Sequence, residues 1–200
     1  MTSRTLANPG DRLVLAFGAS IWLTSAALVG FSGLLAFDRP ALIPGSILTL
    51  SALLVWLYSR GGALRRVADQ IDLRAIILAH AIRAPIGAYF LWKTARGELD
   101  PMFAWVGGPG DIAAGSLSLV AAALVPLRTQ RRRLGVWLWN IGALIDILLT
   151  AGTAARILLF SGHPETMSAL LAMPGPLLPL FIVPLVITSH LLLLRRLRME

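Results

Sequence analysis

Six long apolar stretches, separated by short polar segments, constrain the fold of this chain more than any other feature. A helix needs about 20 consecutive apolar residues to cross the hydrocarbon core of a bilayer. In lipid each segment must satisfy its own backbone hydrogen bonds, as an α-helix does. We therefore predict an all-α integral membrane protein, a six-transmembrane-helix bundle that forms a single transmembrane domain over residues 1–200. The predicted spans are residues 13–36, 41–58, 74–94, 110–128, 135–158 and 175–194.

The composition agrees with this class. Hydrophobic residues make up 56% of the chain and charged residues only 14%, whereas a soluble domain carries roughly a quarter charged residues. The first apolar run is too long for the core of a signal peptide, so we expect a retained helix. The absence of cysteine excludes disulfides, thiolate metal sites and cysteine nucleophiles. The net charge of +8 does not point to nucleic acid, because the arginines lie at the ends of the apolar runs.

The arginine distribution predicts the orientation, because cytoplasmic loops carry an excess of basic residues. Thirteen of the 18 basic residues fall in the N-terminus, residues 59–74, residues 128–133 and the C-terminus. They are Arg4, Arg12, Arg60, Arg65, Arg66, Arg74, Arg128, Arg131, Arg132, Arg133, Arg195, Arg196 and Arg198. Only Arg39, Lys93, Arg96 and Arg156 fall on the other side. We expect both termini in the cytoplasm and the protein in the cytoplasmic (inner) membrane of a bacterium.

Three connecting segments have unusual patterns. Residues 59–73 and 161–174 suit short helices at the membrane interface. Residues 99–111 combine the apolar group Met102, Phe103, Trp105 and Val106 with the run GGPG at 107–110. Glycine and proline disfavour a regular helix. We therefore expect residues 99–111 to form a re-entrant or interface-lying turn that folds back against the outer face of the bundle.

Two opposite charges fall near the middle of the predicted membrane. An isolated charge at this depth is costly, so Arg83 and Asp146 should pair between the third and fifth spans. We therefore expect Arg83 to face Asp146, or else Asp111, in the interior of the bundle. Gly87 and Gly142 lie on the same helix faces and would let these two helices approach closely. The pair is either part of a functional site or a purely structural ion pair.

A second polar layer is expected toward the cytoplasmic side. The 1.5 Å helical rise places His80, Asn140 and His190 at one depth, roughly 8–10 Å into the membrane. Pro184 frees a backbone carbonyl and favours a bend that brings His190 inward. These histidines either form a site or satisfy structural hydrogen bonds. A b-type haem between His80 and His190 is an alternative, whereas a zinc site lacks a good ligand set.

The remaining candidate, Asp111, begins the predicted fourth span and is either a site residue or an N-cap. The full candidate ligand or ion pathway comprises His80, Arg83, Asp111, Asn140, Asp146 and His190. No metal site is predicted.

Four segments over residues 74–196 carry a resemblance: HAIRAPIGAYFLW, MFAWVGGPGDIAAG, WLWNIGALID and PLFIVPLVITSHLLLLRRL. They resemble a widespread family of uncharacterised small six-helix bacterial membrane proteins. The matching residues are Arg83, Gly110, Asp111, Trp139, Asn140, Pro184 and His190. The resemblance implies a six-helix fold and supplies no substrate or mechanism.

The functional prediction is correspondingly broad. The polar residues favour binding or transport of a small molecule or proton among the third to sixth spans. Common enzyme signatures such as HExxH and the Walker A sequence are absent, which disfavours an enzyme. The alternatives are a membrane-embedded enzyme or b-haem redox protein that uses His80 and His190, and an accessory subunit of a membrane complex. Expected partners are the lipid bilayer and either a small ligand or another membrane protein; the sequence leaves the oligomeric state open.

Overall fold

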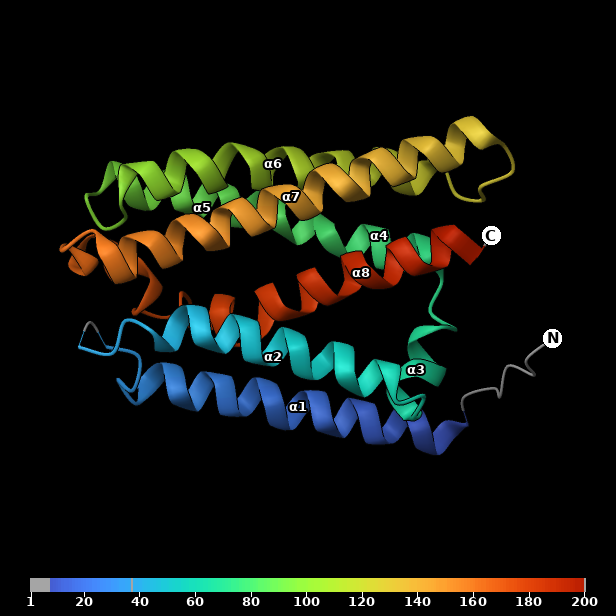
Figure 1. Ribbon diagram of the computed structural model, residues 1–200, viewed down its shortest axis with the longest axis horizontal. Coiled ribbons are helices and arrows are strands. Elements are labelled where there is room, and N and C mark those ends of the chain that lie inside the picture. The colour runs from blue at the N-terminus through green and yellow to red at the C-terminus, as the bar shows by residue number, and fades with distance from the viewer. Residues whose placement is uncertain (1–7, 37, 200) are drawn as a thin grey trace.

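The computed structural model describes residues 8–36 and 38–199, so Arg4 lies outside the described residues. The described chain is helical, with short connections between long rods (Figure 1). The long elements are α1 (Pro9–Phe31), α2 (Leu42–Ser59), α4 (Leu73–Ala79), α5 (Arg83–Ala95), α6 (Pro101–Ala123), α7 (Gln130–Phe160) and α8 (Val183–Met199). The short elements are α3 (Ala63–Ala68), η1 (His80–Ile82), η2 (Pro164–Leu170) and the π-helical η3 (Leu178–Ile182).

Among the described residues, five helices are long and apolar enough to cross a membrane: Pro9–Phe31, Leu42–Ser59, Leu73–Ala95, Gln130–Phe160 and Leu178–Met199. The third joins α4, η1 and α5 into one rod, and the fifth joins η3 to α8. Large apolar side chains such as Leu13, Phe17 and Leu149 are exposed along these rods, as lipid-facing residues are. These features indicate a multi-pass membrane protein. The helix α6 is not among the five, although it has 23 residues and lies beside α5 and α7 (Figure 1).

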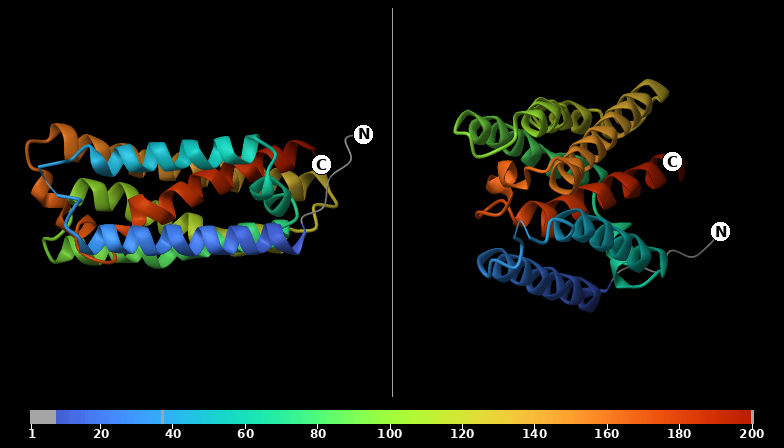
Figure 2. Two further views of the ribbon diagram at one scale, coloured as in Figure 1. Left: turned by 90° about the horizontal axis from the view of Figure 1, so that it is seen from below. Right: turned by 60° about the vertical axis from the view of Figure 1, so that its left-hand side comes forward.

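The long rods run lengthwise along the molecule, as the left view of Figure 2 shows. The rods α4–α5, α6 and α7 pack together on one side, and α8 lies between this group and α2. The start of α1 and the end of α8 lie at the same end of the bundle, together with α3 and the loop between α6 and α7 (Figure 1). The arginine-rich segments 59–74, 128–133 and 195–198 are therefore gathered at this end.

The prediction for residues 99–111 is wrong. Asp100 caps a helix that starts at Pro101 and continues without interruption through the run GGPG to Ala123. The Asp100 carboxylate accepts hydrogen bonds from the backbone N–H groups of Met102 and Phe103, at 2.8 and 3.3 Å. Asp before Pro at the first helical position is a helix-start signal that outweighs the glycines that follow. Because those glycines face neighbouring helices, their missing side chains serve close packing.

The two segments predicted to lie at the interface do form short helices, α3 and η2. The α3 residue Arg66 makes an ion pair with Asp11 of α1, with 2.6 Å between Nη2 and Oδ1. At the other end, the Glu98 carbonyl accepts the backbone N–H of Ala169 and the hydroxyl of Ser168, both at 3.0 Å. The short helix α3 is thereby joined to α1, and η2 to the loop between α5 and α6.

The start of α8 explains how α1 is attached. Residue 184 is proline and has no N–H to donate to the carbonyl of Leu180 four residues earlier. The indole Nε1 of Trp22 in α1 donates to that carbonyl at 2.8 Å instead. Pro184 thus frees a carbonyl, as the sequence predicts, and a helix distant in sequence occupies it.

Candidate functional site

The side chain of Arg83 lies at the centre of the bundle, where η1 meets α5, and only 2% of it is exposed. Its Nε donates to Asp111 Oδ1 of α6 at 2.7 Å, and its Nη2 donates to Asp146 Oδ2 of α7. Its Nη1 donates to the Ala143 carbonyl at 2.9 Å. The prediction that Arg83 faces Asp146 or Asp111 is confirmed, because it binds both. One guanidinium thereby joins three helices.

Glycines let these groups meet. A Cβ on Gly115 of α6 would lie 2.4 Å from the backbone nitrogen of Ala84, which follows Arg83. A Cβ on Gly110 would lie 1.7 Å from Asp146 Oδ1. Both distances are too short for a real contact, so a side chain at position 115 would push the backbone of α5 away, and one at position 110 would displace the Asp146 carboxylate. The glycines of α6 therefore bring the backbone of α5 and the carboxylate of α7 close enough for Arg83 to bind both partners.

Asp111 does not cap a helix. It lies in the interior of α6, ten residues after Pro101, and the N-cap is Asp100. Its carboxylate is buried against Arg83, with 3% of the side chain exposed. The N-cap alternative for Asp111 is wrong, and its site alternative agrees with the contact to Arg83. Sequence reasoning missed Asp100 as the helix start, although its position before Pro101 is the signal.

His190 is held neutral by its neighbours. Its Nε2 lies 3.4 Å from Arg83 Nη1, and an arginine nitrogen can only donate. Nε2 must then be the bare acceptor, so the ring proton is on Nδ1. That proton is donated to Asn140 Oδ1 at 2.8 Å, while Asn140 Nδ2 donates to the His190 carbonyl at 3.2 Å. Asn140 therefore fixes both the tautomer and the orientation of the ring.

His80 completes this layer. Its ring centroid lies 4.2 Å from that of His190. Ser189 uses its one hydroxyl proton on the Val186 carbonyl at 2.8 Å, so its oxygen accepts from His80 Nε2 at 3.1 Å. The other ring nitrogen, Nδ1, is buried and has no hydrogen-bond partner among the described residues. His80, Asn140 and His190 thus form one polar cluster, as predicted, and it joins the ion-pair cluster through Arg83.

The same geometry argues against a b-type haem between the two histidines. A porphyrin bound by both rings would have to lie between them, and at 4.2 Å the rings are in direct contact. Both nitrogens of His190 are also engaged, with Asn140 and Arg83. The haem alternative from the sequence therefore does not fit these side chains.

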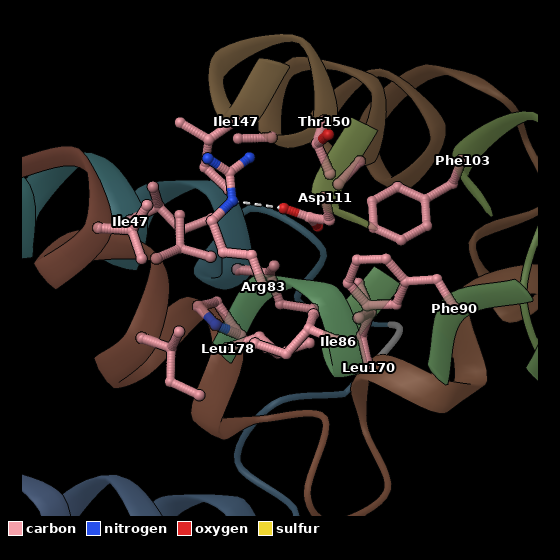
Figure 3. A pocket seen from close by; sticks show the side chains of 17 residues that line it. Ile47, Arg83, Ile86, Phe90, Phe103, Asp111, Ile147, Thr150, Leu170 and Leu178 are labelled. Carbon is pink, nitrogen blue, oxygen red and sulfur yellow. Dashed lines mark hydrogen bonds and ion pairs between the residues drawn. The ribbon is translucent and has the colours of Figure 1, made fainter. Parts of the chain in front are cut away.

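The ion-pair cluster borders two separate spaces. Arg83 and Asp111 lie on the wall of a cavity of about 50 Å³ lined mostly by apolar side chains (Figure 3). The lining includes Phe103 and Leu178, so this cavity extends toward the end of the bundle that carries η2. Thr150 also lines it, and its buried hydroxyl has no hydrogen-bond partner within the part of the chain that the structure describes.

Asp146 borders a groove of about 540 Å³ between α6 and α7, which extends toward Leu124 and Gly135 at the opposite end of the bundle. Neither Arg83 nor Asp111 lines this groove. Arg83 therefore stands between two carboxylates that face different spaces.

Comparison with known proteins leaves the chemistry of the site open. No curated protein and no solved structure matches the chain. One family model, described as a domain of unknown function (DUF8737), matches residues 42–198. That range runs from the start of α2 to the last turn of α8 and contains all six candidate residues, while α1 lies outside it. The chain belongs to this DUF8737 family.

Proposed function

We propose that this protein is a six-span inner-membrane protein that binds a proton at the Arg83–Asp111–Asp146 cluster and passes it between the two spaces beside that cluster. The observation that carries the proposal is the balance of charge. Two carboxylates share one guanidinium in the bundle interior. His190 adds no positive charge, because its Nε2 faces Arg83. With both carboxylates ionised, the cluster has one negative charge in excess.

An excess charge within a bilayer is expensive, and binding one proton removes it. Protonation of one carboxylate weakens its attraction to Arg83 and leaves the guanidinium to the other. Asp146 faces the groove and Asp111 faces the cavity. Exchange of the proton between the two carboxylates, with a matching shift of Arg83, would therefore move it from one space toward the other.

The proton-binding prediction is tested by infrared spectroscopy of the purified protein in lipid nanodiscs. At neutral pH we expect the carbonyl band of one protonated carboxylic acid, since exposed carboxylates are ionised at that pH. Asp111→Asn and Asp146→Asn should each remove the band, because one carboxylate then balances Arg83. Glu165→Gln, at an exposed position, should leave the band unchanged. A wild-type spectrum without the band would refute the proposal.

The six-span topology makes a separate prediction. If α6 crosses the membrane, reporter fusions after Asp100 and after Gln130 should lie on opposite sides, the first periplasmic and the second cytoplasmic. The support is the arginine-rich end of the bundle and the cytoplasmic preference of such loops. Fusions that report the same side would leave five spans, and a reversed pair would invert the orientation.

A further inference from the structure

The groove between α6 and α7 has the size of a ligand site. Its volume of about 540 Å³ falls within the range of roughly 300–1,000 Å³ for small-molecule pockets. Small residues form much of its walls, among them Ala114 and Gly142, and Leu117 and Trp139 add larger apolar surface. The groove lies along the contact between α6 and α7, and Leu117, Val120 and Leu138 of its lining are more than half exposed, so it opens on the outer surface of the bundle.

Asp146 gives the groove a polar end. Of its side chain 19% is exposed, against 3% for Asp111. Arg83 binds Oδ2, and within the described part of the chain Oδ1 receives no hydrogen bond. Oδ1 lies over Gly110, which also lines the groove. One carboxylate oxygen is therefore free to accept a hydrogen bond or to face a positive charge in the groove.

The residues around this oxygen define the chemistry of an occupant. The walls suit an apolar body, and Trp139, two turns before Asp146 on the same face of α7, offers an aromatic surface that attracts cations. The cluster behind Asp146 already has one more carboxylate than cation. A neutral lipid tail would leave that charge uncompensated, and an anion would add to it. A single positive charge on an apolar molecule would balance it.

We propose that the α6–α7 groove binds lipophilic cations, such as apolar molecules with a protonated amine, which reach Asp146 from the bilayer. The proposal rests on the excess negative charge of the proposed proton site, since proton and cation would neutralise the same cluster. Binding of a cation should then displace the proton from the cluster.

The test uses two probes of the same shape and opposite charge, tetraphenylphosphonium and tetraphenylborate, with the wild-type protein in nanodiscs. Equilibrium dialysis should show saturable binding of the phosphonium, while the borate partitions into lipid without saturation. Binding should weaken as the pH falls, with release of about one proton per bound cation by linkage. Saturable binding of both probes, or of neither, would overturn the proposal.

A matched pair of variants locates the site. Gly142 lines the groove, and among the described residues nothing lies within 4 Å of a Cβ built on it, so Gly142→Leu places a larger side chain in the groove. Gly152 lies on the same helix, also with nothing within 4 Å of its Cβ, and is not a groove residue. Gly142→Leu should weaken phosphonium binding by about tenfold or more, whereas Gly152→Leu should not. Equal binding by the two variants would overturn the proposal.

Asp146→Asn provides a second variant that does not depend on filling the groove. It should also weaken phosphonium binding by about tenfold, because the carboxylate is lost. Unchanged binding by Asp146→Asn would contradict the role of the charge.

If the infrared band of a protonated acid is present and the phosphonium does not bind, the groove proposal fails and the proton site stands. If the band is absent and the phosphonium binds at Asp146, the proton site fails instead.

Discussion

Replacing Arg83 with alanine should lower the free energy of unfolding by about 3–5 kcal/mol, the loss expected when one partner of a buried ion pair is removed. The two carboxylates of Asp111 and Asp146 would then share the bundle interior without a cation. The Ala143 carbonyl and His190 Nε2 would also lose their donor. Thermal unfolding in detergent, followed by the fluorescence of the six tryptophans, measures the effect.

The control for Arg83→Ala is Arg39→Ala, because Arg39 pairs with Asp38 on the surface at 3.8 Å. Exposed pairs contribute only about 0–1 kcal/mol, so this variant should unfold close to wild type. Arg83→Met combined with Asp111→Asn and Asp146→Asn should recover part of the lost stability, because it removes all three charges together. Equal unfolding temperatures for the two single alanine variants would contradict the central role of Arg83.

The pairing of the buried charges was predictable from the sequence, because the cost of an isolated charge in lipid applies to any membrane protein. A charge at mid-membrane depth must find a partner, and this alone directed Arg83 to Asp146 or Asp111. Depth matching along helices also grouped His80, Asn140 and His190 correctly. Neither argument could tell that Arg83 would bind two carboxylates at once. That depends on how three helices converge, which is a property of tertiary packing.

The glycines were the main source of error. In the sequence, the run at 107–110 indicates a break, because glycine and proline are poor helix formers in water. In a packed membrane bundle, neighbouring helices tolerate both residues and small residues allow close approach. Helical periodicity also places Gly87 correctly on the face of its helix that packs in the bundle, but predicts α7 as its neighbour, whereas the neighbour is α6. A Cβ on Gly87 would lie 2.3 Å from the Gly108 carbonyl of α6, not against α7, and Gly142 faces open space.

The attachment of α1 to the bundle also depends on a contact that local sequence patterns do not predict. Proline predicts that a carbonyl becomes free four residues earlier, and this was correct for Leu180. The donor that reaches it, Trp22, is 158 residues away in the sequence. Periodicity and propensity concern local segments, so they could not identify this pairing.

Packing at Gly115 leads to the second large effect. Gly115→Ala should destabilise the protein by about 1–3 kcal/mol, as overpacking does. The new methyl group would lie 2.4 Å from the backbone nitrogen of Ala84, and a backbone atom cannot rotate away as a side-chain end can. The helices α5 and α6 must then separate locally. Because Ala84 follows Arg83 directly, this separation also pulls the guanidinium away from Asp111.

Gly142→Ala is the matched control for Gly115→Ala, since both glycines lie inside long helices and only one is crowded. Alanine is the better helix former by about 1 kcal/mol, so Gly142→Ala should be neutral or stabilising. The two variants should therefore shift the unfolding temperature in opposite directions, or leave only Gly115→Ala lowered. The infrared spectrum of Gly115→Ala should also change, because the Arg83–Asp111 pair is disturbed. A Gly115→Ala protein as stable as wild type would mean that α5 and α6 do not pack at this distance, and the geometry of the ion-pair cluster would have to be revised with it.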